Sequence, residues 1–425
     1  MNEKLALNDG EPVIKNNFKI YNSLGNEEVI AAKQVIESGV LSKYLGCWHK
    51  DFYGGEKVQE FESDCQAYFN VKHAITVNSW TSGLVAAVGA LNIEPGDEII
   101  VSPWTMTASA AAILHWNAIP VFADIDRSTF CLDLESVEKN ISPFTKAIMS
   151  VDIFGQSANV DELNQIAKKY NLKVISDTAQ SPGAKYKGRY AGTLTDIGGF
   201  SLNYHKHIHT GEGGILVTND DNLAERMRLI RNHAEAVIGD MGRKDLNNMI
   251  GHNFRLGEIE SAIGIEQLKK LDKLTKSRQR LAKKLDNGLA ELSGLTTPHV
   301  PNDQTHVYYI YPLIYDSKIH GINKNIIYKA LTAEGVPCLS QEYQNIHLLP
   351  IYQKKIAYGK SGFPWTIGKR EISYNKGICP NAEELNDNCY LGIGLCMYDF
   401  NDEDIELIIK AFKKVWKNLY QLKDL

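Results

Sequence analysis

The sequence contains no continuous apolar run long enough to cross a membrane. A transmembrane helix needs about 18 or more consecutive apolar residues. The longest candidate, residues 108–123, is interrupted by His115, Trp116, Asn117 and Pro120. No apolar stretch follows the first methionine either. The sequence therefore predicts neither a membrane segment nor a secretory signal.

Paired cysteines and an excess of basic residues are also missing. The seven cysteines are scattered along the chain and none forms a Cys-x-x-Cys pair, which disfavours a zinc site or a disulfide framework. Reduced thiols in a cytoplasmic protein are the simplest interpretation. The net charge of −5 disfavours nucleic-acid binding, which usually needs a strong basic excess.

What the sequence does contain is a regular alternation of short apolar runs and helix-compatible stretches between residues 70 and 220. This alternation predicts an α/β fold with a mainly parallel, seven-stranded sheet covered by helices on both faces. The predicted strands span residues 74–78, 98–102, 120–124, 145–153, 173–177, 196–202 and 214–219. The predicted helices span residues 81–91, 107–116, 132–140 and 160–170.

After residue 257 the pattern changes to that of a smaller α+β domain. The 425 residues are about three times a typical domain, which suits one large and one small domain. The later elements are a long amphipathic helix over residues 258–287, strands at 308–315 and 336–339, and a helix at 403–419. We divide the chain into an N-terminal segment (1–60) that packs on the small domain or on a partner, a large domain (61–274) and a small domain (275–425).

Lys206 stands among three histidines in a segment that begins as a strand and ends in a glycine-rich turn. A lysine at the end of a parallel strand can form a Schiff base with a carbonyl cofactor, if a desolvated, cationic neighbourhood removes its proton. On an extended strand His205, His207 and His209 would share one face, so a metal site is an alternative. Ordinary hydrogen bonding in a loop or core is another.

Asp177 ends an apolar strand at the edge where ligands of parallel sheets bind. A buried carboxylate is costly unless it meets a cation or several hydrogen-bond donors, and a protonated pyridine nitrogen is such a cation. The alternative is that Asp177 caps a following helix.

Thr81 and Ser82 stand at the expected start of a helix. Hydroxyl and amide groups at a helix start form a phosphate cradle, although ordinary N-capping is an alternative. The cradle, Asp177 and Lys206 together provide partners for the phosphate, the pyridinium and the aldehyde of pyridoxal phosphate.

The motifs that contain these residues resemble the DegT/DnrJ/EryC1/StrS sugar aminotransferases, a branch of the fold-type I pyridoxal phosphate enzymes. The resemblance extends over residues 20–420. It rests on Asp177-Thr-Ala-Gln180, Gly192, Asp196, Phe200-Ser201, Lys206, and residues 210–214, 95–99, 120–126, 231–233 and 253–258.

The resemblance implies pyridoxal 5'-phosphate as the cofactor and assigns roles by position. Lys206 matches the Schiff-base lysine, Asp177 the partner of the pyridine nitrogen, and Gln180 the residue that bonds the ring hydroxyl. Both Lys206 and Asp177 are expected to be catalytic. A branch of the family with histidine in place of the lysine dehydrates ketosugars, so Lys206 favours transamination.

The phosphate ligands implied by the same resemblance are Thr81, Ser82, Ser201 and Asn253. The asparagine matches one that reaches the phosphate of the neighbouring subunit, which implies a homodimer with shared active sites.

Two positions depart from the family pattern. Met106 replaces the aromatic residue that usually stacks on the cofactor ring, and Trp104 is the candidate to stack instead, with a plain packing role as the alternative. His207 replaces a more usual asparagine.

The implied reaction moves an amino group from L-glutamate or L-glutamine to a nucleotide-linked ketosugar, for aminosugars of surface glycans or secondary metabolites. The alternatives are an aminotransferase of a cyclic polyol ketone, and a cofactor- or sugar-binding regulator without turnover. Lys369 and Arg370 are candidates to line the substrate groove, against the simpler interpretation of a surface loop. No metal, nucleic acid or membrane is expected as a partner.

Overall fold

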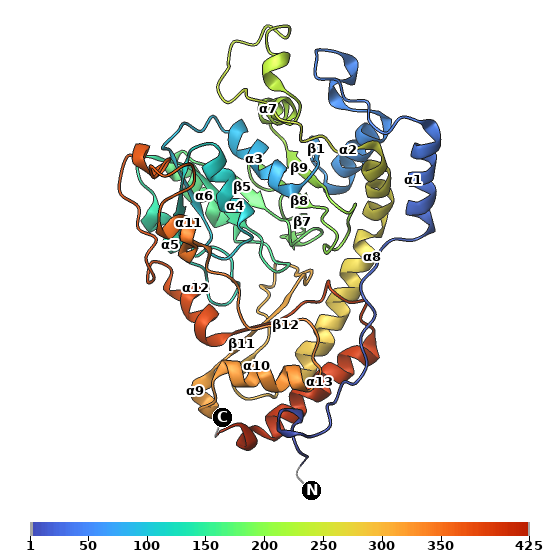
Figure 1. Cartoon of the computed structure of the whole chain (residues 1–425), viewed down its shortest axis with the longest axis vertical. Coiled ribbons are helices and arrows are strands. Elements are labelled where there is room, and N and C mark those ends of the chain that lie inside the picture. The colour runs from blue at the N-terminus through green and yellow to red at the C-terminus, as the bar shows by residue number, and fades with distance from the viewer. Residues whose placement is uncertain (1–2, 424–425) are drawn as a thin grey trace.

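The computed structural model describes residues 3–423 and is built around a seven-stranded mixed sheet (Figure 1). The strand order is β1-β9-β8-β5-β4-β2-β3. Neighbouring strands from β8 to β3 are parallel, and only β9 runs antiparallel to its two neighbours. The bounds are β1 (His73–Val77), β2 (Glu98–Val101), β3 (Ile119–Phe122), β4 (Thr145–Val151), β5 (Lys173–Asp177), β8 (Ile197–Ser201) and β9 (Gly214–Thr218). The predicted mainly parallel sheet is confirmed.

Helices cover both faces of this sheet because its strands are apolar on both sides. One face of β1, β8 and β9 packs against α2 and α8 (Glu258–Leu289) through Phe61, Phe200 and Leu268. The other face packs against α3 and α7 through Leu84 and Met227. The helices of this part are α2 (Glu56–Phe69), α3 (Trp80–Ala90), α4 (Ala108–His115), α5 (Leu134–Asn140), α6 (Val160–Tyr170) and α7 (Asp221–Arg231). A short hairpin, β6 (Lys185–Tyr186) with β7 (Arg189–Tyr190), lies outside the large sheet.

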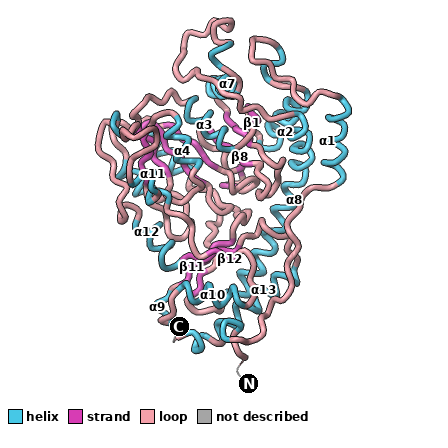
Figure 2. Tube along the Cα trace, viewed as in Figure 1, coloured by secondary structure: helices cyan, strands magenta, loops and turns pink. Residues whose placement is uncertain are grey.

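The second sheet is four-stranded and antiparallel, with the order β10-β11-β13-β12. It lies at the end of the molecule where both termini lie (Figures 1 and 2). Its core includes Leu313 and Leu391 from the strands and Ile408 and Phe412 from the last long helix. The strands are β10 (Leu295–Thr296), β11 (Tyr311–Tyr315), β12 (Leu339–Ser340) and β13 (Tyr390–Ile393). The helices α9 (Ser317–His320), α10 (Lys324–Ala333) and α13 (Asp402–Lys417) belong to this part, whereas α11 (Pro350–Gln353) and α12 (Pro380–Glu384) pack against the large core.

Helix α8 (Glu258–Leu289) connects the two sheets (Figure 1). At 1.5 Å per residue its 32 residues span about 48 Å. Helix α1 (Asn26–Ser38) packs along it. The chain before α1 lies on the small sheet's core, where Leu5 and Ile14 are buried. No helix within residues 3–423 is long and apolar enough to span a bilayer.

The C-terminal part sends a long excursion, residues 345–379, back to the edge strand β3 of the large sheet. The Tyr374 hydroxyl donates to the Pro120 carbonyl at 2.8 Å, and Tyr352 packs in the large core. An exposed edge strand invites pairing with other chains, so this excursion covers the edge. It also fastens the small domain to the large one.

Two predicted strands are shorter than expected. Strand β11 begins at Tyr311 because Tyr308 has a φ of 53°, and β12 begins at Leu339 because Cys338 has a φ of 47°. Both values lie in the left-handed region, which interrupts an extended strand. Periodicity does not reveal such single-residue breaks.

Candidate active site

The site lies where strands β5 and β8 and helix α3 end or begin on one edge of the large sheet. Asp177 is the last residue of β5 and pairs with Gly199 in the neighbouring strand. Ser201 ends β8, and Lys206 follows in the turn between β8 and β9. The sheet order thus places the predicted carboxylate and lysine on adjacent strand ends.

Asp177 is held by donors from three directions. Its Oδ1 accepts from the Trp80 indole N–H at 2.7 Å and from the Ala179 amide at 3.2 Å, and its Oδ2 accepts from the Ser109 hydroxyl at 2.7 Å. A carboxylate offers about four acceptor positions, so one is left for a ligand. The segment 178–184 forms turns and no helix, so the helix-cap alternative for Asp177 is wrong.

Lys206 is 7% exposed, and its Nζ lies 4.3 Å from the centroid of the Tyr309 ring. Burial lowers the pKa of this amine to about 8, while the negative charge of Asp177 acts in the opposite direction. A lowered pKa provides the neutral amine that a nucleophilic lysine needs. The sequence predicted a neighbourhood that is both desolvated and cationic. Desolvation lowers the pKa of Lys206, whereas the charges that act on the amine raise it.

Contacts from distant segments hold the turn that carries Lys206. The Tyr21 hydroxyl donates to the His207 carbonyl at 2.6 Å, and the His207 Nε2 lies 2.8 Å from the Val307 carbonyl. The backbone amide of Lys206 donates to the Asn203 carbonyl at 2.9 Å. The N-terminal segment and the segment after α8 therefore both fix the position of the lysine.

The three histidines around Lys206 do not form an alternating face. Residues 204–208 are turns and bends, so the extended geometry that a three-histidine metal site requires is absent. His207 is fully buried, and burial lowers the pKa of His205 to about 4. Within residues 3–423 no group of three or more His, Cys, Asp or Glu side chains is arranged to hold a metal ion. The described residues therefore do not provide the three-histidine face on which the metal alternative depends.

The predicted cradle is the start of α3. The Ser79 hydroxyl caps the helix by accepting from the Ser82 amide at 3.1 Å, and the Ser82 hydroxyl donates to the Asn78 Oδ1 at 2.7 Å. Thr81 is exposed. The first amides of a helix have no intrahelical acceptor and can bind an anion. Ser201, 6% exposed at the end of β8, accepts from the Asn203 amide at 3.3 Å.

Gln180 is fixed from both ends of its amide. The Oε1 accepts from the Phe154 amide at 2.8 Å, and the Nε2 donates to the Tyr343 hydroxyl at 3.0 Å. An amide nitrogen has two donors, so the second N–H can bond a ligand oxygen.

The prediction that Trp104 stacks on the cofactor ring is wrong. Its side chain is fully buried and its indole N–H donates to the Asn345 Oδ1 at 2.8 Å. One face stacks on Phe130 with the ring centroids 5.8 Å apart, and Tyr390 meets it edge-on. No face of the indole is open to a cofactor ring, so the packing alternative is correct. Met106, at the position of the usual aromatic residue, is 63% exposed.

The backbone of Asn253 contacts the cradle of its own chain. Its carbonyl accepts from the Asn78 Nδ2 at 3.4 Å, and its side chain is exposed. Its reach into a neighbouring subunit stays a prediction.

Lys369 and Arg370 lie away from the site. They form ion pairs with Asp97 and Glu98 at the start of β2, at N–O distances of 2.9 and 2.6 Å. The start of a parallel strand is the edge opposite to the ligand edge. The structure therefore places the two cations at the base of the sheet, where they fasten the excursion 345–379.

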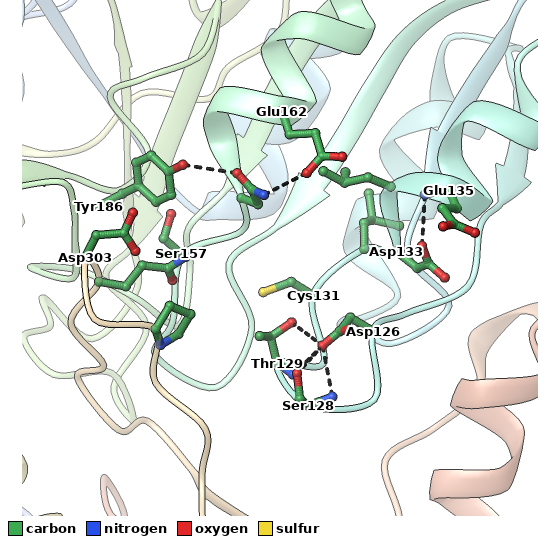
Figure 3. A pocket seen from close by; sticks show the side chains of 15 residues that line it. Asp126, Ser128, Thr129, Cys131, Asp133, Glu135, Ser157, Glu162, Tyr186 and Asp303 are labelled. Atoms are coloured by element: carbon green, nitrogen blue, oxygen red, sulfur yellow. Dashed lines mark hydrogen bonds between the residues drawn. The ribbon is translucent and has the colours of Figure 1, made fainter.

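A pocket of about 380 Å³ between the loop after β3 and α6 is also separate from the site (Figure 3). Carboxylates of Asp133, Glu135, Glu162 and Asp303 line it. None of the predicted site residues lines this pocket.

Several residues that complete the site could not be assigned from the sequence. Trp80 and Ser109 contact Asp177, Tyr309 lies against Lys206, and Tyr343 holds Gln180. Trp80 belongs to the cradle motif, so the motif predicts that it lies near the site. Nothing in the sequence indicates that its indole turns toward a carboxylate 97 positions away.

These residues fit pyridoxal phosphate. The carboxylate has one acceptor position left for a ring nitrogen, the buried amine has the lowered pKa that suits attack on an aldehyde, and the α3 start offers hydroxyl and amide donors for a phosphate. The three lie on one sheet edge in the order that the cofactor needs.

Comparisons with known proteins agree with this geometry. The sequence profile described as the DegT/DnrJ/EryC1/StrS aminotransferase family matches residues 46–386. The spore coat polysaccharide biosynthesis protein SpsC of Bacillus subtilis is 34% identical over 412 residues, covering 95% of this chain and 98% of that protein. The GDP-perosamine synthase of Caulobacter vibrioides is 38% identical over 299 residues, covering 70% of this chain and 79% of that protein.

Two further proteins extend the comparison. The L-glutamine:2-deoxy-scyllo-inosose aminotransferase of Streptoalloteichus tenebrarius is 32% identical and covers 82% of this chain and 83% of that protein. The aminotransferase structure from Psychrobacter cryohalolentis has a TM-score of 0.81 at 27% identity, covering 95% of this chain and 100% of that chain. The chain belongs to the DegT/DnrJ/EryC1/StrS family of sugar aminotransferases and is a pyridoxal phosphate-dependent enzyme.

Proposed function

We propose that this aminotransferase moves an amino group from L-glutamate or L-glutamine to the keto carbon of a nucleotide-linked ketosugar, in the cytoplasm, for a surface glycan or a secondary metabolite. The observation that carries the transfer chemistry is the buried amine of Lys206, in the turn after β8, the strand that pairs with the end of β5 at Asp177. The GDP-perosamine synthase of Caulobacter vibrioides, named for a nucleotide-linked product, supports the substrate class.

The proposed residue roles rest on this geometry and, for Asn253, on the family resemblance. Lys206 is the covalent attachment point and the proton carrier, and Asp177 pairs with the ring nitrogen. Gln180 bonds the ring hydroxyl with its second N–H. The phosphate is held by Thr81, Ser82 and Ser201 of one subunit and by Asn253 of its neighbour.

When bound, pyridoxal phosphate supplies a carbonyl that accepts the amino group and a ring that takes up electrons. Lys206 removes the proton from the α-carbon of the donor and later delivers a proton to the sugar carbon. Its pKa of about 8 lies near neutral pH, where one amine can both take and return a proton efficiently. Asp177 keeps a negative charge beside the ring nitrogen and thereby favours its protonated form.

The protein is proposed to act as a homodimer. The exposed side chain of Asn253 stands next to the cradle, and the large apolar side chains of Leu246 and Ile250 shortly before it are 58% and 67% exposed. A second subunit that covered these side chains would bring its own asparagine to the shared site.

A cyclic polyol ketone is the second candidate acceptor. The aminotransferase of Streptoalloteichus tenebrarius, named for 2-deoxy-scyllo-inosose, is 32% identical over 359 residues. Such an acceptor carries no nucleotide, so the two candidates differ in whether a diphosphate is required for binding.

The experiment is a screen with the loaded enzyme. Nucleotide-linked ketosugars and cyclic polyol ketones are offered with glutamate or with glutamine, and the release of the 2-oxo acid is followed. Turnover only with nucleotide-linked ketosugars supports the proposal, and turnover only with cyclic ketones overturns the substrate class. Lys206→Ala is the control and is expected to abolish turnover and the visible absorbance of the bound cofactor. Cofactor binding without turnover of any acceptor would favour the regulator alternative.

A further inference from the structure

We propose that Trp80 is a positioning residue for the cofactor: its indole fixes the carboxylate of Asp177 at a set distance from the phosphate cradle. The inference rests on the proposed function, because it deepens the role given to Asp177. It stands on three observations, namely the contacts of the indole, the slot in which it lies, and its place in α3.

The first observation is that two side chains hold the two oxygens of Asp177. The Trp80 indole N–H donates to Oδ1 at 2.7 Å and the Ser109 hydroxyl donates to Oδ2 at 2.7 Å. Trp80 is 6% exposed and Ser109 is fully buried. Hydrogen bonds to a charged group are stronger than neutral ones, and in a buried place they fix its orientation. The plane of the carboxylate is therefore set by α3 and α4, which carry the two donors.

The second observation is a slot of glycines that admits the indole. A Cβ at Gly199 would lie 2.3 Å from the Trp80 ring and 2.2 Å from the Ile215 carbonyl oxygen. A Cβ at Gly83 would lie 2.8 Å from the ring, and one at Gly214 would lie 2.9 Å from the Trp80 backbone. Real Cβ contacts are essentially never this short. Gly199 and Gly214 stand in β8 and β9, where glycine weakens a strand and marks a close approach. Gly83 and Gly199 therefore leave the space that the indole occupies, and Gly214 leaves the space for the backbone at the start of α3.

The third observation is that Trp80 is the first residue of α3, directly before Thr81 and Ser82. The backbone of Trp80 also packs on Gly214 of β9. A rigid indole between the helix start and Asp177 thus ties the phosphate end of the site to the pyridine end. Because a cofactor held at both ends must match their separation, a change in that separation weakens its binding.

The test measures binding of pyridoxal phosphate to the cofactor-free protein, with Trp80→Phe as the variant. Phenylalanine keeps an aromatic ring in the slot and removes the N–H donor. We expect the dissociation constant to rise about tenfold or more, because the free protein no longer holds the carboxylate in the orientation that the ring nitrogen needs. We also expect the visible circular dichroism of the bound cofactor to fall, because its ring is held less firmly.

The matched control is Trp116→Phe. Trp116 is 8% exposed, its indole N–H donates to the Val85 carbonyl at 2.7 Å, and it too lies against a glycine, Gly89. The control removes the same donor from a comparable notch whose acceptor is a backbone carbonyl. Its affinity and dichroism should match the wild type. Equal losses in both variants would overturn the inference, because they would show a general packing effect.

A double-variant cycle separates this inference from the proposed function. In an Asp177→Asn background, Trp80→Phe should add little further loss of affinity if it acts through the carboxylate. A fully additive loss would overturn the positioning role. Turnover within a few-fold of wild type in Asp177→Asn alone would instead overturn the proposed function. Unchanged affinity and dichroism in Trp80→Phe, with Asp177→Asn inactive, would overturn only the inference.

Ser109→Ala keeps the inference testable if Trp80→Phe does not fold. It removes the donor to the other oxygen in a small, conservative step. We expect affinity to fall about threefold, because one oxygen of the carboxylate is held less firmly before the cofactor binds, together with weaker dichroism. Wild-type values for both quantities would contradict a carboxylate held by its donors.

Discussion

At the scale of residues, burial gives the Lys206 amine its lowered pKa and at the same time lowers the stability of the fold. Lys206 is nearly fully buried. Among residues 3–423 no carboxylate forms an ion pair with its amine. Its pKa is about 8 in the folded protein, against an ordinary value of 10.5. A lowered lysine pKa means that the folded state binds its proton less well than the unfolded state does. The lysine that is proposed to carry the reaction is therefore one that destabilises the fold.

The first prediction concerns this cost in the cofactor-free protein. Lys206→Met should raise the free energy of unfolding below pH 8 by on the order of 3 kcal/mol, the equivalent of the pKa shift. The penalty is fully present below the folded pKa of about 8 and disappears as the pH rises to the unfolded value. The advantage of the variant should therefore shrink between about pH 8 and pH 10.5.

Urea unfolding at several pH values measures this difference. Lys168→Met, which removes an exposed lysine of α6, is the matched control and should follow the wild type. Identical stabilities of Lys206→Met and the wild type at pH 7 would contradict a strained lysine.

The second prediction concerns Asp177. Asp177→Asn keeps the size of the side chain and a carbonyl acceptor, yet it removes the charge that favours a protonated ring nitrogen. We expect turnover to fall by orders of magnitude while cofactor still attaches through Lys206. The melting temperature should change little. Steady-state kinetics and the visible spectrum test this, and an enzyme that kept most of its activity would refute the pairing.

At the scale of elements, the sequence was sufficient where a pattern extends over several residues. All seven strands of the large sheet and the helices α3 to α6 follow their predicted ranges within a few residues, because apolar runs and periodicity report burial directly. The prediction was wrong where one residue changes the backbone, as at Tyr308 and Cys338.

The sequence predicted those residues of the candidate site that belong to local motifs. Lys206 and Asp177 come to one edge because the strand order brings β5 beside β8. Trp80 and Tyr21 contact the site through the fold, and no local pattern encodes such contacts. Trp104 was misplaced for the same reason, since only the packed structure shows the rings that cover it.

The third prediction concerns the N-terminal segment as an element of the site. Tyr21→Phe removes the hydroxyl that donates to the His207 carbonyl and keeps the ring, whose centroid lies 4.5 Å from the Arg278 guanidinium. Because the loop next to Lys206 is then held less firmly before the cofactor binds, the dissociation constant of pyridoxal phosphate should rise about three- to tenfold.

Equilibrium binding measures this effect. Tyr315→Phe is the control, since it removes a similar buried bond to the Ile322 carbonyl in the small domain. An equal loss of affinity in the control would show that the effect is not local to the site.

At the scale of the whole molecule, one helix and one excursion join the two sheets. Helix α8 passes from the large core to the small one, and residues 345–379 return to the edge of the large sheet. The predicted boundary between residues 274 and 275 falls inside α8. The large and small domains are therefore joined both by α8 and by the excursion 345–379. Asn253 lies just before α8.

The last prediction concerns assembly. Lys206→Ala and Asn253→Asp should each be inactive, the second because a new negative charge repels the cofactor phosphate. Mixed dimers of the two should contain one site with a native lysine and a native asparagine, if each site draws Asn253 from the other subunit. Random reassortment in equal amounts should then restore about a quarter of the wild-type activity, because half of the symmetric dimers are hybrids with one native site.

A second mixture provides the control for this prediction. Lys206→Ala mixed with Asp177→Asn should give no recovery, because both residues lie on adjacent strand ends of the same subunit. Exchange of subunits is verified by a tag on one variant. No recovery in verified hybrids of the first pair would contradict a shared site, and recovery in the second pair would show that activity returns by another route. Only recovery confined to the first pair agrees with an asparagine that crosses the subunit interface.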